Sequence, residues 1–170
     1  MTKRGFTLIE ILVVIAIIGI LSAVVLASLN TARDKGTDAA IKANLSTIQT
    51  QAELDYSNSN VYGPVGCVSL GTCGISTGNC LVNGTMFKTD PILVKAVAAT
   101  ESINGPLSGT GGGVQCFIHG SGGAYVVESP LVADAGKYWC IDSSGNAKEV
   151  TTYPITLTLG IIDEYVCPTS

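Results

Sequence analysis

Residues 6–29, FTLIEILVVIAIIGILSAVVLASL, form an almost continuous apolar segment that decides the fold. No residue from Ile11 to Leu29 is charged, and this length approaches the ~20 residues that a helix needs to cross a hydrocarbon layer of about 30 Å. The only charged side chain within the segment is Glu10. The sequence therefore predicts one membrane-spanning helix close to the N-terminus.

Three interpretations of this segment compete. A secretory signal peptide has an apolar core of only about 7–15 residues, whereas here the helical pattern continues past the apolar segment. An ordinary membrane anchor explains the length but not Glu10, because a carboxylate at hydrocarbon depth is costly and usually has a partner. In the third interpretation the chain is cut after Gly5, and the new α-amino group of Phe6 neutralises Glu10 of a neighbouring copy. The charge pair would then set the register of an assembly, as buried polar groups do in coiled coils.

The segment KRGFTLIE, residues 3–10, closely resembles the processing motif of type IV prepilins and pseudopilins. The resemblance implies that a membrane peptidase cuts after Gly5, that the new N-terminal Phe6 is methylated and that Glu10 acts in assembly. It covers residues 1–30 and, by pattern alone, a helix extension to residue 57. Many members of the family carry a proline within the apolar helix, whereas this chain has Ala27 in that region.

The rest of the chain divides into a helix extension and a head. After Asn30, four apolar residues recur at the spacings of a single buried helical stripe. These residues are Ile41, Leu45, Ile48 and Ala52. We predict a leader peptide over 1–5, a hydrophobic membrane and filament-core helix over 6–30, an amphipathic extension over 31–57 and a disulfide-stabilised head over 58–170. One long helix is expected from Phe6 to about Asp55, with a soft interruption at Gly36.

The head sequence predicts a short helix and four antiparallel strands. Asp90 is a candidate N-cap, Pro91 suits the first turn, and the helix is expected to end near Ser102. The predicted strands are 114–119, 124–129, 137–142 and 147–151, with a hairpin turn at 143–146 between the last two. These elements predict an α+β fold: the hydrophobic half of the long helix protrudes, and its amphipathic half packs on a small sheet, as the resemblance to pilins also implies.

Six cysteines indicate an exported, oxidising compartment for the head. They are Cys67, Cys73, Cys80, Cys116, Cys140 and Cys167. The spacings of the first three match no CxxC zinc or redox motif, so we interpret all six as structural disulfide candidates. Fifteen pairings are possible. The expected ones are a cross-strand bond between Cys116 and Cys140, and a bond from Cys167 to the loop 67–80.

The sequence contains no pattern that indicates catalysis, a cofactor or a metal. The segment 142–146 faintly resembles a calcium loop, but Tyr153 stands where an EF-hand requires an acidic residue, so a hairpin turn is the better interpretation. His119, the only histidine, has no nearby carboxylate in the sequence, which favours a structural or surface role. A net charge of −4 predicts no general basic surface for nucleic acid. We therefore expect a protein that is not an enzyme.

The residues and the resemblance together predict a structural subunit of a type IV pilus-like filament. The expected partners are further copies of the chain, the prepilin peptidase and methyltransferase, an assembly platform in the inner membrane, and that membrane itself before assembly. The precursor is expected in the inner membrane with its head outside, and the mature chain in an extracellular pilus. Two alternatives stay open: a pseudopilin of a type II secretion system, and a minor pilin at the filament tip that acts as an adhesin or DNA receptor.

Overall fold

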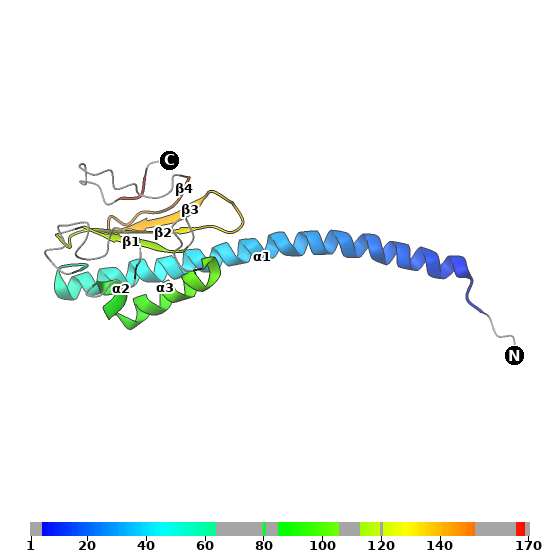
Figure 1. Ribbon diagram of the computed structural model, residues 1–170, viewed down its shortest axis with the longest axis horizontal. Helices are drawn as coiled ribbons and strands as arrows, with labels where there is room; N and C mark the ends of the chain where they lie inside the picture. Colours follow the sequence, from blue (N-terminus) through cyan, green and yellow to red (C-terminus); the bar gives the residue numbers. More distant parts are fainter. Residues whose placement is uncertain are drawn as a thin grey trace.

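The fold is that of a long rod with a head at one end, seen in a computed structural model of the 170-residue chain (Figure 1). The structure describes residues 5–63, 80, 85–105, 113–119, 121–151 and 166–168. The C-terminal half of the first helix, α1, lies between a four-stranded antiparallel sheet and a shorter helix, α3, and the N-terminal half of α1 protrudes (Figure 1). The predicted α+β class and arrangement are confirmed.

Helix α1 spans Leu8–Ser59, and its 52 residues correspond to a length of about 78 Å at 1.5 Å per residue. It ends four residues later than predicted. Asn60 takes a left-handed conformation with a φ of 57° and donates its N–H to the carbonyl of Tyr56. The side chains of residues 57–59 donate to carbonyls three or four residues back, so these turn-forming residues prolong the helix instead of ending it.

The predicted interruption of α1 at Gly36 is wrong, because the helix continues through this residue. The next residue, Thr37, donates its hydroxyl to the carbonyl of Arg33 at 2.9 Å, as in an ordinary helical turn. Gly36 is exposed, and a Cβ built on it would meet no atom within 4 Å. The glycine therefore lowers helix propensity at this position without relieving a close contact.

Replacement of Gly36 by alanine is expected to raise the free energy of unfolding by about 0.5–1 kcal/mol, because alanine has less backbone freedom to lose. Thermal unfolding of the full chain in detergent measures this change. Gly122→Ala is the control and should lower the free energy of unfolding. Gly122 has a φ of +72°, and its added Cβ would lie 2.9 Å from the carbonyl oxygen of Gly63. A Gly36→Ala chain that unfolds at a lower temperature than wild type would contradict the prediction.

The sheet is a meander with the strand order β1-β2-β3-β4, and every neighbouring pair is antiparallel. The strands are β1 Gln115–Ile118, β2 Tyr125–Pro130, β3 Tyr138–Asp142 and β4 Ala147–Val150. Each begins and ends within one residue of its predicted bounds. The turn between β3 and β4 is the predicted hairpin, in which Gly145 supplies a φ of +87°.

Helix α3 spans Pro91–Asn104 and begins as predicted. The carboxylate of Asp90 accepts the N–H groups of Ile92 and Leu93 at 2.7 and 2.9 Å, which satisfies two donors of the first turn. A single-turn helix, α2, precedes it at Met86–Thr89 and was not predicted. The order of elements is therefore α1, α2, α3 and then the sheet.

Asp55 makes the folding stability of the head depend on pH. Burial and the nearby carboxylate of Asp90 raise the pKa of Asp55 above its ordinary value. The folded chain therefore binds this proton more tightly than the unfolded chain, and stability falls as the pH rises through the folded pKa. Asp55→Asn is expected to unfold at a higher temperature than wild type at pH 7, and this difference should shrink below the ordinary pKa of aspartate. Thermal unfolding curves of both chains at a series of pH values measure this difference. The prediction would be contradicted by a difference in unfolding temperature that does not change with pH.

Both faces of the sheet carry a hydrophobic cluster. The face toward α1 receives the predicted helical stripe, whose members Ile41, Leu45, Ile48 and Ala52 are all fully buried. Leu93 and Val97 of α3 are buried in the same core. The opposite face carries a smaller cluster, as expected from the alternation of side chains along a strand. Its members are Phe117, Val126, Cys140, Val150 and Cys167.

The described residues contain two disulfides, which confirms that these four cysteines are bonded in pairs. Cys80 is bonded to Cys116 across a Cα–Cα distance of 4.8 Å, and Cys140 is bonded to Cys167 across 5.8 Å. The expected bond from Cys167 to the loop 67–80 is therefore wrong, since Cys167 pairs with β3 instead. Cys67 and Cys73 lie outside the described residues.

The predicted bond between Cys116 and Cys140 is also wrong, for two geometric reasons. Strand β2 lies between their strands, and two spacings of about 4.8 Å exceed the ~7 Å Cα separation that a disulfide tolerates. The register adds a second obstacle: Cys116 lies opposite Val127, whereas Cys140 lies opposite Glu128. Adjacent residues of β2 point to opposite faces, and so do the two cysteines.

The buried carboxylate of Asp142 connects the C-terminal segment to the β3–β4 hairpin. Its Oδ1 accepts the N–H groups of Ser144 and Asn146 at 2.9 and 3.1 Å. Its Oδ2 accepts the side-chain amide of Asn146 at 2.8 Å and the N–H of Cys167 at 2.7 Å. Cys167 is thus held by a disulfide to Cys140 and by a hydrogen bond two residues further along the same strand.

A second buried carboxylate, Asp38, fastens α1 to the loop between β2 and β3. Asp38 accepts the N–H of Val132 at 2.6 Å and the N–H of Ala133 at 3.2 and 3.3 Å. It lies three residues before Ile41 and therefore extends the buried stripe by one position with an acidic residue. The rod and this loop are consequently joined at a fixed point.

Candidate assembly surface

The protruding half of α1 begins with a capping box. Thr7 is the N-cap, and its hydroxyl oxygen accepts the N–H of Glu10 at 3.4 Å. In return, Oε2 of Glu10 accepts the N–H of Thr7 at 2.8 Å and its hydroxyl at 2.7 Å. This reciprocal arrangement satisfies donors that a helix N-terminus otherwise leaves unpaired.

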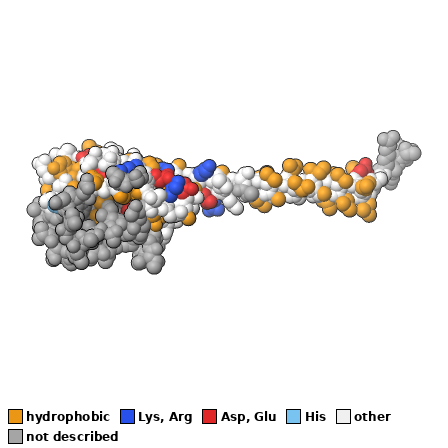
Figure 2. Space-filling model, turned by 90° about the horizontal axis from the view of Figure 1, so that it is seen from above, with side chains coloured by type: hydrophobic (Ala, Val, Ile, Leu, Met, Phe, Trp, Pro, Cys, Tyr) orange, Lys and Arg blue, Asp and Glu red, His pale blue; other side chains and the backbone are white. Residues whose placement is uncertain are grey.

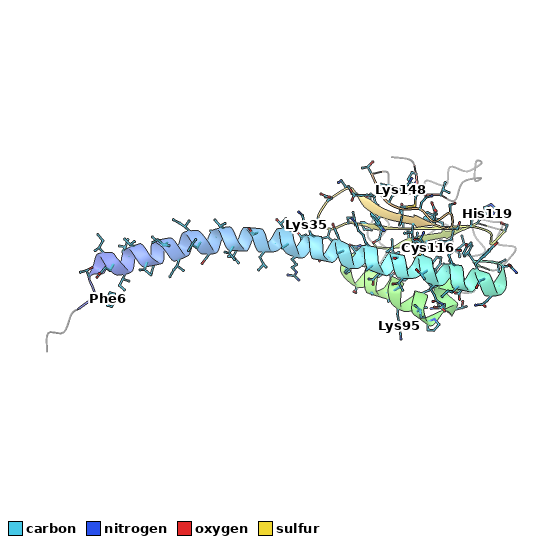
Figure 3. The ribbon with its side chains drawn as sticks, turned by 180° about the vertical axis from the view of Figure 1, so that it is seen from behind. Phe6, Lys35, Lys95, Cys116, His119 and Lys148 are labelled. Atoms are coloured by element: carbon cyan, nitrogen blue, oxygen red, sulfur yellow. A yellow bond between two sulfur atoms is a disulfide. The ribbon has the colours of Figure 1, made fainter. Side chains whose placement is uncertain are left out.

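Gly5 and Phe6 lie just ahead of this cap, outside the helix. The ring of Phe6 is 83% exposed (Figure 3). The structure therefore brings the three residues of the predicted processing motif, Gly5, Phe6 and Glu10, to the free end of the rod. The bond between Gly5 and Phe6 lies ahead of the helix, and both residues are exposed, so a peptidase can reach it.

Both hydrogen bonds from Thr7 go to the same carboxylate oxygen of Glu10. Among the residues that the structure describes, Oε1 of Glu10 has no partner. Thr7 therefore fixes the orientation of the carboxylate and leaves one oxygen available to a cation from outside the subunit. A negative charge in the first turn is also favoured by the helix dipole.

The remainder of the protruding half is an apolar surface on all sides. From Leu8 to Leu29 the Leu, Ile and Val side chains are between 49% and 81% exposed. Figure 2 shows hydrophobic side chains along this half of the rod and charged ones where it joins the head. Such a large exposed apolar surface indicates contact with lipid or with other protein chains.

Helix α1 is the one helix among the described residues that is long and apolar enough to cross a membrane. Its apolar window lies in the protruding half, and none of that window is buried within the subunit. The predicted membrane-spanning character is consistent with this finding.

Three polar residues that organise the structure were missed in the sequence as individual sites. Thr7 was recognisable, because Thr-Leu-Ile-Glu at residues 7–10 fits the capping-box pattern before an apolar segment. Asp38 carried no such signal, since the N–H groups that it accepts lie 94 and 95 residues away. Asp142 bonds locally to Ser144 and Asn146, but nothing in the sequence indicated its bond to Cys167, 25 residues away.

Comparison with known proteins matches part of the chain. Residues 1–26 match the family described as "Prokaryotic N-terminal methylation motif". Over 59 residues the chain is 42% identical to the "Type IV wide pilus major component PilA4" of Thermus thermophilus. The aligned region is 35% of this chain and 45% of that relative, so the chain spans less than half of the relative's length. No solved structure matches the chain.

Proposed function

From its place in the type IV pilin family, which the methylation motif and the similarity to a Thermus pilin support, we propose that this chain is a structural subunit of a type IV pilus-like filament. The precursor spans the cytoplasmic membrane with its head outside. A prepilin peptidase cuts after Gly5, Phe6 becomes the methylated N-terminus, and an assembly platform inserts the subunit into a helical filament. The observation that carries this proposal is the exposed apolar rod with an oriented carboxylate at its tip.

The apolar rod supplies the association energy. In the finished filament, each Leu, Ile or Val side chain that the bundle of identical helices keeps from water contributes roughly 1.5–3 kcal/mol, at full burial, against dissociation into water. This attraction is non-directional, so it does not select one axial position of a helix against its neighbours.

Glu10 supplies the register. An unpaired carboxylate is strongly disfavoured inside an apolar bundle, whereas a carboxylate beside a positive amine is tolerated. The N-terminal amine created at Phe6 lies four residues from Glu10, so a neighbour shifted by a short axial step brings the two groups together. Thr7 presents Oε1 of Glu10 for this contact by holding Oε2.

The disulfides fit the proposed location of the head. Bonds such as Cys80–Cys116 and Cys140–Cys167 form and persist in an oxidising compartment outside the cytoplasm. A structural role also agrees with the name of the Thermus relative, which describes a pilus component.

The test is electron microscopy of sheared surface filaments combined with mass spectrometry of their subunits. The expected result is a filament whose major subunit begins at methylated Phe6. Recovery of a chain that still begins at Met1, or of dispersed subunits with no filaments, would overturn the proposal.

A further inference from the structure

The base of the head carries a surface that faces back along the rod. We call it the base platform and define it as Arg33, Lys35 and the loop 131–137 between β2 and β3. Arg33 lies four residues beyond Leu29, which is about 6 Å along the helix. The loop extends from the sheet toward the protruding half of α1 (Figure 1). The platform therefore lies where the apolar rod enters the head.

The loop presents an exposed apolar tip. Val132 is 41% exposed, and Ala133, Ala135 and Gly136 are exposed beside it. In the described part of the head, Val132 is one of three large hydrophobic side chains with this much exposure. The others are Leu54 and Ile92. Because Asp38 holds the loop to α1, the tip has a fixed height along the rod.

The cations of the platform are available to an external partner. Arg33 and Lys35 are exposed, and neither forms an ion pair within the described residues. Asp34 and Asp134 line the same hollow as Lys35, so the surface carries charges of both signs. The neighbouring Lys137, in contrast, lies 2.8 Å from Glu149 and 3.2 Å from Asp134. Figure 3 shows Lys35 at the junction of rod and head, far from Lys95 on α3.

We propose that the base platform rests on the phospholipid headgroups of the outer leaflet of the cytoplasmic membrane while the subunit is unassembled. This inference rests on the proposed function, because it requires α1 to span that membrane. If the hydrocarbon layer ends near Leu29, the headgroup layer extends about 5–8 Å further. Arg33 and Lys35 then lie at the level of the lipid phosphates, where cationic side chains are favoured.

The loop 131–137 contacts the same headgroup layer beside the helix. Asp38 is nine residues, about 13 Å, beyond Leu29, and the loop that it anchors points back toward the membrane. An apolar tip beside cations is the combination that binds a membrane interface. The contact fixes the height and tilt of the head, and extraction into a filament breaks it.

Tryptophan placed at three positions of the full chain tests this inference. The chain is reconstituted in vesicles of phosphatidylethanolamine and phosphatidylglycerol that contain lipid brominated near the top of its acyl chains. The quenching of each tryptophan reports how close its segment lies to the brominated lipid. Ala135→Trp reports on the loop, Val24→Trp on the rod, and Ser57→Trp on the opposite end of the head. Quenching is compared with wild type, in which Trp139 gives the background. We expect the added fluorescence to be largely lost at positions 135 and 24 and retained at position 57.

The pattern of quenching separates the two hypotheses. Quenching at position 24 without quenching at position 135 would overturn the platform and leave the membrane-spanning helix intact. Absence of quenching at position 24 would overturn the spanning helix itself. In the Ala135→Trp chain, Arg33→Gln together with Lys35→Gln should reduce the quenching, while Lys95→Gln, which removes an exposed lysine on α3, should not. Equal quenching in both charge variants would overturn the role of the cations.

Discussion

Glu10→Ala is expected to abolish filaments while the precursor is still cut after Gly5. The mutation leaves the apolar rod and its association energy intact. It removes the only charge that opposes the amine of Phe6, so that amine would enter the bundle unpaired, which is strongly disfavoured. Subunits should therefore remain in the membrane in their processed form. Electron microscopy of surface filaments and the N-terminal mass of the membrane-bound chain measure the two outcomes.

Glu10→Gln separates the charge from the capping box. The glutamine side chain keeps an oxygen that accepts from the N–H and hydroxyl of Thr7, but it carries no charge. We expect this variant to lose filaments as well, since the helix start is preserved and the charge pair is not. Ser22→Ala, an exposed change in the same half of the rod, is the control that should assemble normally. Wild-type filaments in either Glu10 variant would contradict the pairing.

Asp142→Ala is expected to lower the free energy of unfolding by about 3–5 kcal/mol. The substitution leaves the N–H groups of Ser144, Asn146 and Cys167 without their acceptor in a buried part of the head. Each buried donor left unsatisfied costs about 1–3 kcal/mol. Denaturant unfolding of the full chain in detergent, with the disulfides intact, measures the loss.

The control for this prediction is Asp134→Ala. Asp134 is exposed and its carboxylate contacts only Lys137 among the described residues, at 3.2 Å, so its removal should change stability by no more than about 0.5 kcal/mol. Asp142→Asn should lose an amount of unfolding free energy between those of Asp142→Ala and Asp134→Ala, because an amide keeps one acceptor oxygen. A change at Asp142→Ala as small as that at Asp134→Ala would show that its hydrogen bonds do not stabilise the head.

The features that were predicted correctly depend on local sequence. The apolar segment, the buried stripe from Ile41 to Ala52 and the cap at Asp90 are set by residues within one or two turns of each other. Apolar and polar side chains alternate over the few residues of each strand, and Gly145 indicates the turn in which it lies. The motif around Glu10 is local as well, so its place at the tip of the rod follows from the sequence, while its processing stays a prediction.

The features that were missed depend on strand order and register. The sequence does not state that β2 separates Cys116 from Cys140, and a shift of one residue in the pairing reverses the face of every side chain. Asp38 becomes a buried acceptor, and Asp142 accepts the N–H of Cys167, only because the fold brings distant backbone to them. The extra turn at residues 57–59 arises from side chains that bond backward along the helix, which the composition of that segment does not distinguish from a turn.

The continuity of α1 has a mechanical consequence. The same helix forms the rod, enters the core at Ile41 and ends at Asn60, so tension applied to the head passes directly into the axis of the rod. With no hinge between them, the load is carried by the ladder of backbone hydrogen bonds in series. Stretching should begin at Gly19, the residue of lowest helix propensity in the protruding half, and the head should stay folded while the filament lengthens.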